Sequence, residues 1–181
     1  DQVSLSYYLS FGTPVTILRP FNTCGPRQSL RAVIPSIILQ GLNKSLRKKK
    51  IHVGSLKPTR DFNYVEDIVN AYILSIKNKK CIGEIINLST GTEISIKEIV
   101  NLVSDILDIK YQVIQKEERI RPSSSEVYRL CGSNKKAQKI LKWKPKYSGN
   151  KMFKEAIIKT IDWYKNPINL KSFKNVNKFT L

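Results

Sequence analysis

The sequence predicts an α/β fold, and three observations lead to this expectation. Short runs rich in β-branched residues alternate along the chain with amphipathic segments of helical spacing. With 181 residues, of which 41% are hydrophobic, the chain is long enough to bury a substantial core. No internal repeat, low-complexity block or linker divides it. We therefore expect one domain over residues 1–165, followed by a frayed tail at 166–181.

The first elements are a helix end, a strand and a loop. Residues 1–11 have the pattern of a helix that Gly12 and Pro14 bring to an end. The short run at 15–18 is apolar and rich in β-branched residues, which predicts a buried strand. Turn-forming residues dominate the stretch 22–29. We predict that this stretch is a loop.

The next elements are a helix, a strand and a second helix. Residues 32–42 predict a helix with Pro35 in its first turn, where a proline is tolerated. A basic connection at 44–50 leads into a short strand at 51–54. Apolar residues recur at helical spacing over 65–76, and acidic residues at its start favour the positive end of the helix dipole.

The second half of the chain repeats this alternation. Residues 84–88 predict a strand, and residues 96–107 predict a helix. Ser95 suits the N-cap of that helix, because Glu98 follows three residues later in the capping-box pattern. A further strand is expected near 111–114. The last two amphipathic helices are predicted at 134–141 and 152–164.

The charge of the chain is strongly positive. It has 32 Lys and Arg against 14 Asp and Glu, a formal net charge of +18. Such a surplus is compatible with a polyanionic partner. The lysines are scattered over the whole length, however, which favours compositional bias and a solvated surface over a nucleic-acid site. No apolar run is long enough to span a membrane. From these two observations, we expect neither nucleic acid nor a membrane as the partner.

The cysteines and the histidine do not form a recognisable metal or disulfide pattern. Cys24, Cys81 and Cys131 are odd in number and far apart, which argues against a disulfide-stapled secreted scaffold. His52 is the only histidine and has no ligand spacing to any cysteine. We expect no metal site, and a reducing cytoplasm fits this cysteine usage best.

The chain contains no fingerprint of catalysis or dinucleotide binding. No glycine cluster forms G-x-G-x-x-G or a phosphate-binding P-loop. The only Tyr-x-x-x-Lys spacing joins Tyr147 to Lys151 in a turn-forming stretch, and we interpret it as a chance match. No catalytic residue is therefore predicted within this chain.

Three loops carry residues suited to an anionic ligand. Asn22 follows a predicted buried strand and offers both a donor and an acceptor, although a structural Asx turn explains it equally well. Arg60 has a guanidinium fork for a diphosphate, and its alternative is a surface ion pair with Asp61. Arg119 and Arg121 lie together in a third loop. Convergence of these loops on one sheet edge predicts a pyrophosphate ligand.

The motifs and their order resemble a known family. They occur at matching separations: Arg19-Pro20-Phe21-Asn22-x-x-Gly25-Pro26, Val33-Ile34-Pro35, Arg60-Asp61-Phe62-x-Tyr64-Val65-x-Asp67, Asn87, Arg121-Pro122 and Trp143-x-Pro145. The set resembles the C-terminal half of extended short-chain dehydrogenases/reductases that act on nucleotide sugars. It is most similar to NAD-dependent 4,6-dehydratases, such as those acting on GDP-mannose or on nucleotide-linked N-acetylglucosamine in legionaminic-type sugar synthesis.

The resemblance implies a fold and an activity. The fold would be the C-terminal part of a Rossmann-like fold with a small substrate-binding subdomain, with the N-terminal dinucleotide-binding half absent. The implied enzyme is an NAD- or NADP-dependent lyase of surface-polysaccharide or glycan biosynthesis, which forms a homodimer. Its catalytic Tyr and Lys would precede this chain, so the chain would be inactive alone. A 4-epimerase, a UDP-glucuronate decarboxylase and a basic polyanion-binding module remain the alternatives.

The resemblance also implies roles for individual residues. Pro20 and Phe21 would lie beside the nicotinamide ring of the cofactor. The remaining residues would bind the nucleotide-diphosphate sugar, with the two arginines on the diphosphate: Asn22, Val33, Pro35, Val53, Arg60, Asn87 and Arg121.

Overall fold

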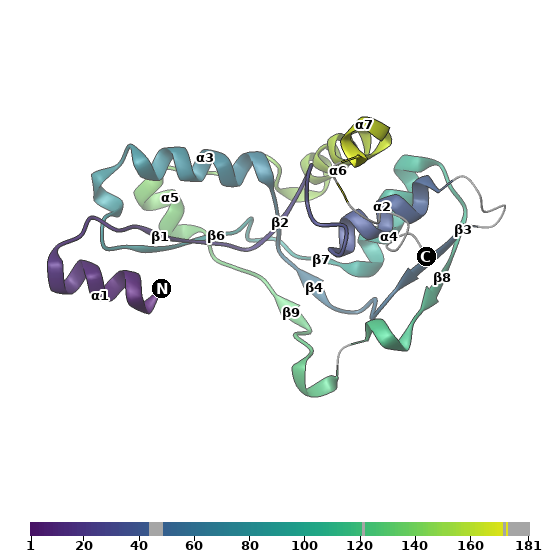
Figure 1. Ribbon diagram of the computed structural model, residues 1–181, viewed down its shortest axis with the longest axis horizontal. Coiled ribbons are helices and arrows are strands. Elements are labelled where there is room, and N and C mark those ends of the chain that lie inside the picture. Colours follow the sequence, from purple (N-terminus) through teal and green to yellow (C-terminus); the bar gives the residue numbers. More distant parts are fainter. Residues whose placement is uncertain (44–48, 121, 172, 174–181) are drawn as a thin grey trace.

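The computed structural model describes residues 1–43, 49–120, 122–171 and 173. These residues form two lobes along the long axis of the molecule, joined by extended segments (Figure 1). The lobe with the N-terminus contains α1 (Gln2–Phe11), β1 (Ile17–Pro20), α3 (Val65–Ile76), β6 (Ile85–Leu88) and α5 (Lys135–Leu141). The other contains α2 (Val33–Leu42), β3 (Lys49–Val53), α4 (Ile96–Leu107), β8 (Tyr111–Gln115), α6 (Gly149–Lys165) and α7 (Pro167–Leu170).

Short strands connect the lobes and form two of the four small sheets among the described residues. The connecting strands are β2 (Asn22–Cys24), β4 (Thr59–Arg60), β5 (Phe62–Tyr64), β7 (Ile94–Ser95) and β9 (Arg129–Leu130). The pairs β1–β6, β2–β5 and β3–β8 are parallel. Strand β4 pairs antiparallel with β7 and parallel with β9. Parallel strands separated in sequence by helices confirm the α/β class.

The long helices confirm the helical periodicity of the sequence. Helices α3 and α4 have the predicted bounds, and α2 begins one residue later than predicted. Gly12 ends α1 in the left-handed conformation, with φ 66°, which glycine adopts without steric cost. Helix α6 begins at Gly149, three residues before the predicted start.

The short strands were not predicted. The stretch 22–29 contains β2, because Asn22–Cys24 pairs with β5 some forty residues later. All three residues of β5 are buried, so the strand lacks the alternation by which a half-exposed strand is detected. The predicted frayed tail begins with α7, whose first turn is capped by the Asn166 side chain.

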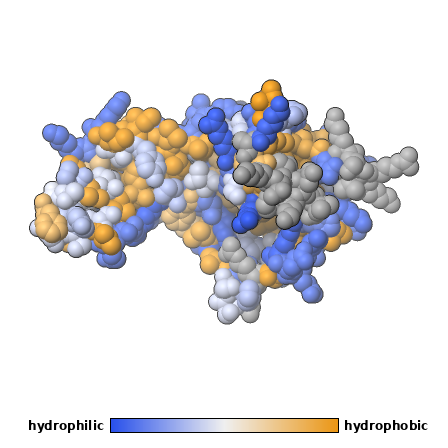
Figure 2. Space-filling model, viewed as in Figure 1, coloured by the Kyte–Doolittle hydropathy of each residue, from blue (hydrophilic) through white to orange (hydrophobic). Residues whose placement is uncertain are grey.

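Two main hydrophobic clusters match the two lobes. The larger cluster packs α2, α4 and α6 against β3 and β5, with Ile37, Ile99 and Ile157 fully buried. The smaller cluster packs α3 and α5 against β6 around the buried Trp143. On the outer surface of α3, Val69 and Ile76 are 52% and 85% exposed, and apolar atoms are visible on this lobe in Figure 2.

The capping box of α4 gives a prediction on stability. The Ser95 hydroxyl accepts from the Glu98 amide at 3.2 Å, and the Glu98 carboxylate accepts from the Ser95 amide at 2.8 Å. Replacing Glu98 by alanine is expected to lower the free energy of unfolding by about 1 kcal/mol in urea denaturation at pH 7. Glu155→Ala, an exposed change within α6, is the matched control.

The same carboxylate sets the pH dependence of this effect. Hydrogen bonds from Ser95 hold the pKa of Glu98 below its ordinary value. Its contribution is therefore complete above the unfolded-state pKa, about 4.3, and is lost as the pH falls through the lower folded-state pKa. The difference between wild type and Glu98→Ala should shrink over that range. A difference that does not change with pH would contradict this assignment.

Candidate functional site

A cavity of about 640 Å³ lies between the start of α2, the end of β3 and the short strands β2 and β4. This volume lies within the range of small-molecule sites. Apolar residues such as Ile37 and Phe62 form part of its wall. The charged residues Arg60, Arg119 and Glu126 form another part. The structure therefore combines an apolar surface with a small number of charged groups, as ligand sites do.

Four of the predicted substrate residues line this cavity. They are Asn22 from β2, Val33 from the first turn of α2, Val53 at the end of β3 and Arg60 from β4. The Asn22 amide donates to the backbone carbonyl of Asp61 at 3.3 Å. The structure thus brings together residues that are up to 38 positions apart in the sequence.

The other predicted residues lie elsewhere. Pro35 is buried within α2, two residues beyond Val33, and is not part of the cavity wall. Pro20, Phe21 and Asn87 lie at or next to the end of the β1–β6 pair, where Arg19 stands opposite Asn87. Arg121 lies outside the residues that the structure describes. The basic connection 44–50 lies partly outside them as well.

The end of the β1–β6 pair contains an unpaired polar group beside an aromatic ring. The Phe21 amide donates to the Leu88 carbonyl at 2.9 Å. A Cβ added to Gly132 would stand 2.6 Å from both the Phe21 ring and the Ser89 Cβ, so the three residues are tightly packed. Among the described residues, the buried Ser89 hydroxyl has no hydrogen-bond partner. The Phe21 ring therefore lies at the carboxyl end of a parallel strand pair, the edge where ligands of α/β sheets bind.

Arg60 pairs with Glu126 and not with its neighbour. Its guanidinium donates to the Thr59 carbonyl at 2.8 Å and lies 3.2 Å from the Glu126 carboxylate. The Arg60 and Glu126 side chains are 15% and 10% exposed. The alternative of a surface ion pair between Arg60 and Asp61 is therefore wrong, because successive side chains of a strand point to opposite faces.

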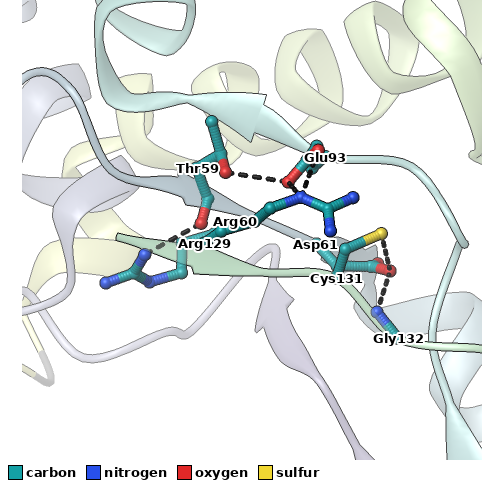
Figure 3. A network of polar contacts seen from close by, with 7 residues as sticks. All are labelled: Thr59, Arg60, Asp61, Glu93, Arg129, Cys131 and Gly132. Carbon is teal, nitrogen blue, oxygen red and sulfur yellow. Dashed lines mark hydrogen bonds and ion pairs between the residues drawn. The ribbon is translucent and has the colours of Figure 1, made fainter. Parts of the chain in front are cut away.

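Asp61 is fully buried and accepts several hydrogen bonds. Its carboxylate accepts from the Thr90 amide at 2.8 Å, the Thr90 hydroxyl at 2.7 Å, the Gly91 amide at 3.0 Å and the Gly132 amide at 3.2 Å. Figure 3 shows Asp61 and Cys131 on one side of β4 and the Arg60 guanidinium on the other. Asp61 thus fixes two loops beneath the strand that presents Arg60.

His52 is held in the wall of the cavity through its backbone. The buried Gln40 side chain accepts from the His52 amide at 2.7 Å and donates to its carbonyl at 3.2 Å. The Arg119 guanidinium donates to the same carbonyl at 2.8 Å. The pKa of the His52 imidazole is lowered, and burial is the largest cause. The nearby cations Lys116, Arg119 and Lys50 lower it further. The ring is therefore neutral at pH 7.

Two polar residues of the wall were missed as site residues. Gln28 and Glu126 both line the cavity. Gln28 stands within the predicted loop, and Glu126 is 66 positions from its partner Arg60. No periodicity or local motif marks either one, because each acquires its place only through tertiary packing.

The Tyr-x-x-x-Lys match does not form a catalytic pair. Tyr147 is buried against Tyr64, with ring centroids 4.6 Å apart. Its hydroxyl hydrogen-bonds with Glu66 and with the ammonium group of Lys159. Lys151 is exposed on α6. The two side chains therefore have different surroundings.

The remaining candidate groups do not form further sites. Burial raises the pKa of the Cys24 thiol to about 12, so this thiol is a poor nucleophile at neutral pH. Among the described ranges, no group of three His, Cys, Asp or Glu side chains is arranged to hold a metal ion. A search of the same ranges for a membrane-spanning helix finds none.

The family model for GDP-mannose 4,6 dehydratase matches residues 1–156. The chain belongs to this family. Human dTDP-D-glucose 4,6-dehydratase is 34% identical over 96% of this chain and 47% of the human protein. Among solved structures, RMD from Pseudomonas aeruginosa, complexed with NADPH, has a TM-score of 0.78 at 27% identity, covering 91% of this chain and 53% of that one.

Another similar structure was solved in complex with a nucleotide sugar. UDP-N-acetylglucosamine 4-epimerase from Methanobrevibacter ruminantium, in complex with UDP-N-acetylmuramic acid, has a TM-score of 0.72 at 28% identity. The match covers 88% of this chain and 49% of the epimerase. The chain thus spans about half the length of the family members it matches.

The family match also corrects the predicted fold class. We placed the chain in the C-terminal part of the family fold and expected the dinucleotide-binding half to be absent. The match over residues 1–156 overturns that placement. It supports an α/β, Rossmann-like chain of about half the family length. The prediction relied on the order of the motifs in the chain and on the absence of a glycine-rich motif, and neither observation locates a chain within a fold.

Proposed function

We propose that this chain is the nucleotide-sugar-binding portion of an NAD- or NADP-dependent nucleotide-sugar 4,6-dehydratase. The observation that carries the proposal is the cavity of about 640 Å³ with the Arg60 guanidinium in its wall. A bidentate cation suits a diphosphate, and an apolar wall suits a nucleotide base. Membership of the dehydratase family and the relatives solved with NADPH and a UDP-sugar support the same assignment.

The proposed roles follow the positions of the residues. Arg60 binds the diphosphate in place of Glu126, and Asn22 beside it binds the sugar or the diphosphate. Val33 and Val53 contact the nucleotide base. Pro20 and Phe21 contact the nicotinamide ring, which supplies hydride transfer when the cofactor is bound. Pro35, Asn87 and Arg121 are retained as substrate residues on the basis of the motifs alone.

Other members of the family use the same kind of ligand for different reactions. A 4-epimerase and a UDP-glucuronate decarboxylase also bind a nucleotide-diphosphate sugar, so the binding proposal applies to them too. Within the dehydratases, we propose a role in legionaminic-type sugar synthesis and a homodimeric enzyme. Product analysis of the whole enzyme, by mass and by retention of the C6 oxygen, separates these reactions.

Calorimetric titration tests the binding proposal. The protein is titrated with UDP-glucose, dTDP-glucose and GDP-mannose, and with glucose 1-phosphate and heparin as controls. At least one nucleotide sugar is expected to bind with one site per chain, more tightly than glucose 1-phosphate. Binding of heparin alone, with a strong salt dependence, would instead support the basic polyanion-binding module.

A further inference from the structure

Gln28 is fixed in the wall of the cavity at two points. Its side-chain nitrogen donates to the Thr23 carbonyl at 2.7 Å. Its backbone carbonyl accepts from the buried Tyr164 hydroxyl at 2.8 Å. The preceding residue, Arg27, has φ 65°, a left-handed conformation that is uncommon for a residue other than glycine. The turn therefore holds Gln28 in one position.

The side-chain oxygen of Gln28 has no partner. It is buried, and no described group donates to it. The orientation of the amide is determined, since the Thr23 carbonyl is an acceptor and only the NH₂ end can face it. A buried acceptor without a donor is costly, and such groups in native proteins are few. Because Gln28 lines the cavity, a ligand is the natural source of the missing donor.

We propose that Gln28 is a specificity-determining residue whose side-chain oxygen accepts a hydrogen bond from a sugar hydroxyl of the ligand. This inference rests on the proposed function. Phosphate oxygens at neutral pH are acceptors and leave the amide oxygen unpaired. Gln28 lines the same cavity as Asn22 and Arg60, so the part of the ligand near it is the part next to the proposed diphosphate position. The donors there are hydroxyl groups, either of the ribose or of the hexose.

Titration of a Gln28→Leu variant tests this proposal. The probe is whichever of UDP-glucose, dTDP-glucose and GDP-mannose binds the wild type, together with its nucleoside diphosphate. The control is Gln112→Leu, the same change at an exposed position of β8 outside the cavity wall. Gln28→Leu should weaken binding of the nucleotide sugar about fivefold to tenfold, and Gln112→Leu should leave it unchanged.

The two probes identify the hydroxyl. An equal loss for the nucleotide sugar and the nucleoside diphosphate assigns the ribose, and a loss for the nucleotide sugar alone assigns the hexose. Wild-type affinity of Gln28→Leu for both probes would overturn the proposal while leaving the proposed function intact. If the wild type binds none of the nucleotide sugars, the proposed function itself fails.

Thermal melting of the ligand-free variants separates binding from folding. If Gln28→Leu lowers the melting temperature, the unbranched Gln28→Met is titrated in its place. If Gln28 had only a structural role, both of its variants would lose affinity for both probes and would also melt at a lower temperature. A loss of affinity at an unchanged melting temperature supports the ligand contact.

Discussion

Replacing Arg60 by methionine is expected to weaken binding of a nucleotide-diphosphate sugar about 100-fold. Methionine keeps an unbranched side chain as far as the ε position and removes the guanidinium. Each hydrogen bond between charged groups contributes about 1.5 to 3 kcal/mol, and every 1.4 kcal/mol is about tenfold in affinity. The Arg60 side chain is only 15% exposed, so water competes weakly for its hydrogen bonds. Calorimetric titration of wild type and variant measures the effect.

Arg129 provides the matched control for this experiment. It lies on β9, the neighbouring strand of β4, and forms an ion pair with Glu93 at 2.8 Å. Its guanidinium lies on the opposite side of β4 from that of Arg60 (Figure 3). Arg129→Met removes the same charge from the same sheet and should leave affinity nearly unchanged. Equal losses in the two variants would indicate a general effect of net charge and contradict a specific diphosphate contact.

The partner of Arg60 requires a second control. Arg60→Met leaves the Glu126 carboxylate, 10% exposed, without its cation. An unpaired buried charge destabilises a protein, so the single variant could lose affinity by unfolding. The double variant Arg60→Met with Glu126→Gln removes both charges. It should melt close to the wild type and bind as weakly as the single variant.

The helices could be predicted because their signal is local. Residues 65–76 and 96–107 repeat apolar residues at helical spacing, and the Ser95–Glu98 box marks the start of the second one. The strand β4 has no comparable signal. It consists of two residues and exists because Ser95 lies on one side of Thr59 and Arg129 on the other. Such pairing depends on distant parts of the chain.

The site was predictable only in part, for the same reason. Asn22 and Arg60 stand out in the sequence because turn-forming residues and aromatic neighbours surround them, and the structure places both in one cavity. Gln28 shares the turn-forming stretch of Asn22, but nothing in that stretch distinguishes it from its neighbours, and Glu126 has no comparable context. Their positions depend on the ion pair across 66 residues and on the Tyr164 hydroxyl bond across 136 residues. A sequence pattern that spans ten or twenty residues contains no trace of either contact.

Replacing Asp61 by alanine is expected to lower the free energy of unfolding by about 3 to 5 kcal/mol. The Asp61 side chain is fully buried, and its carboxylate accepts from Thr90, Gly91 and Gly132. Alanine leaves these donors without the acceptor that the buried carboxylate provides. Because the free energy of unfolding of a typical protein is about 5 to 15 kcal/mol, the loss is a large fraction of total stability. Urea denaturation measures it.

Two further variants test whether the buried carboxylate itself accounts for this loss of stability. Asp105→Ala, at an exposed position of α4, removes the same side chain and should change the free energy of unfolding by less than about 0.5 kcal/mol. Asp61→Asn preserves the shape but turns an NH₂ group toward N–H and O–H donors, so it should also destabilise the protein. Near-wild-type stability of Asp61→Asn would mean that shape matters more than the acceptor. The backbone of Asp61 also donates to the Leu130 carbonyl and accepts from the Asn22 amide. Both Asp61 variants keep these backbone groups, so the predicted loss of stability measures the carboxylate alone.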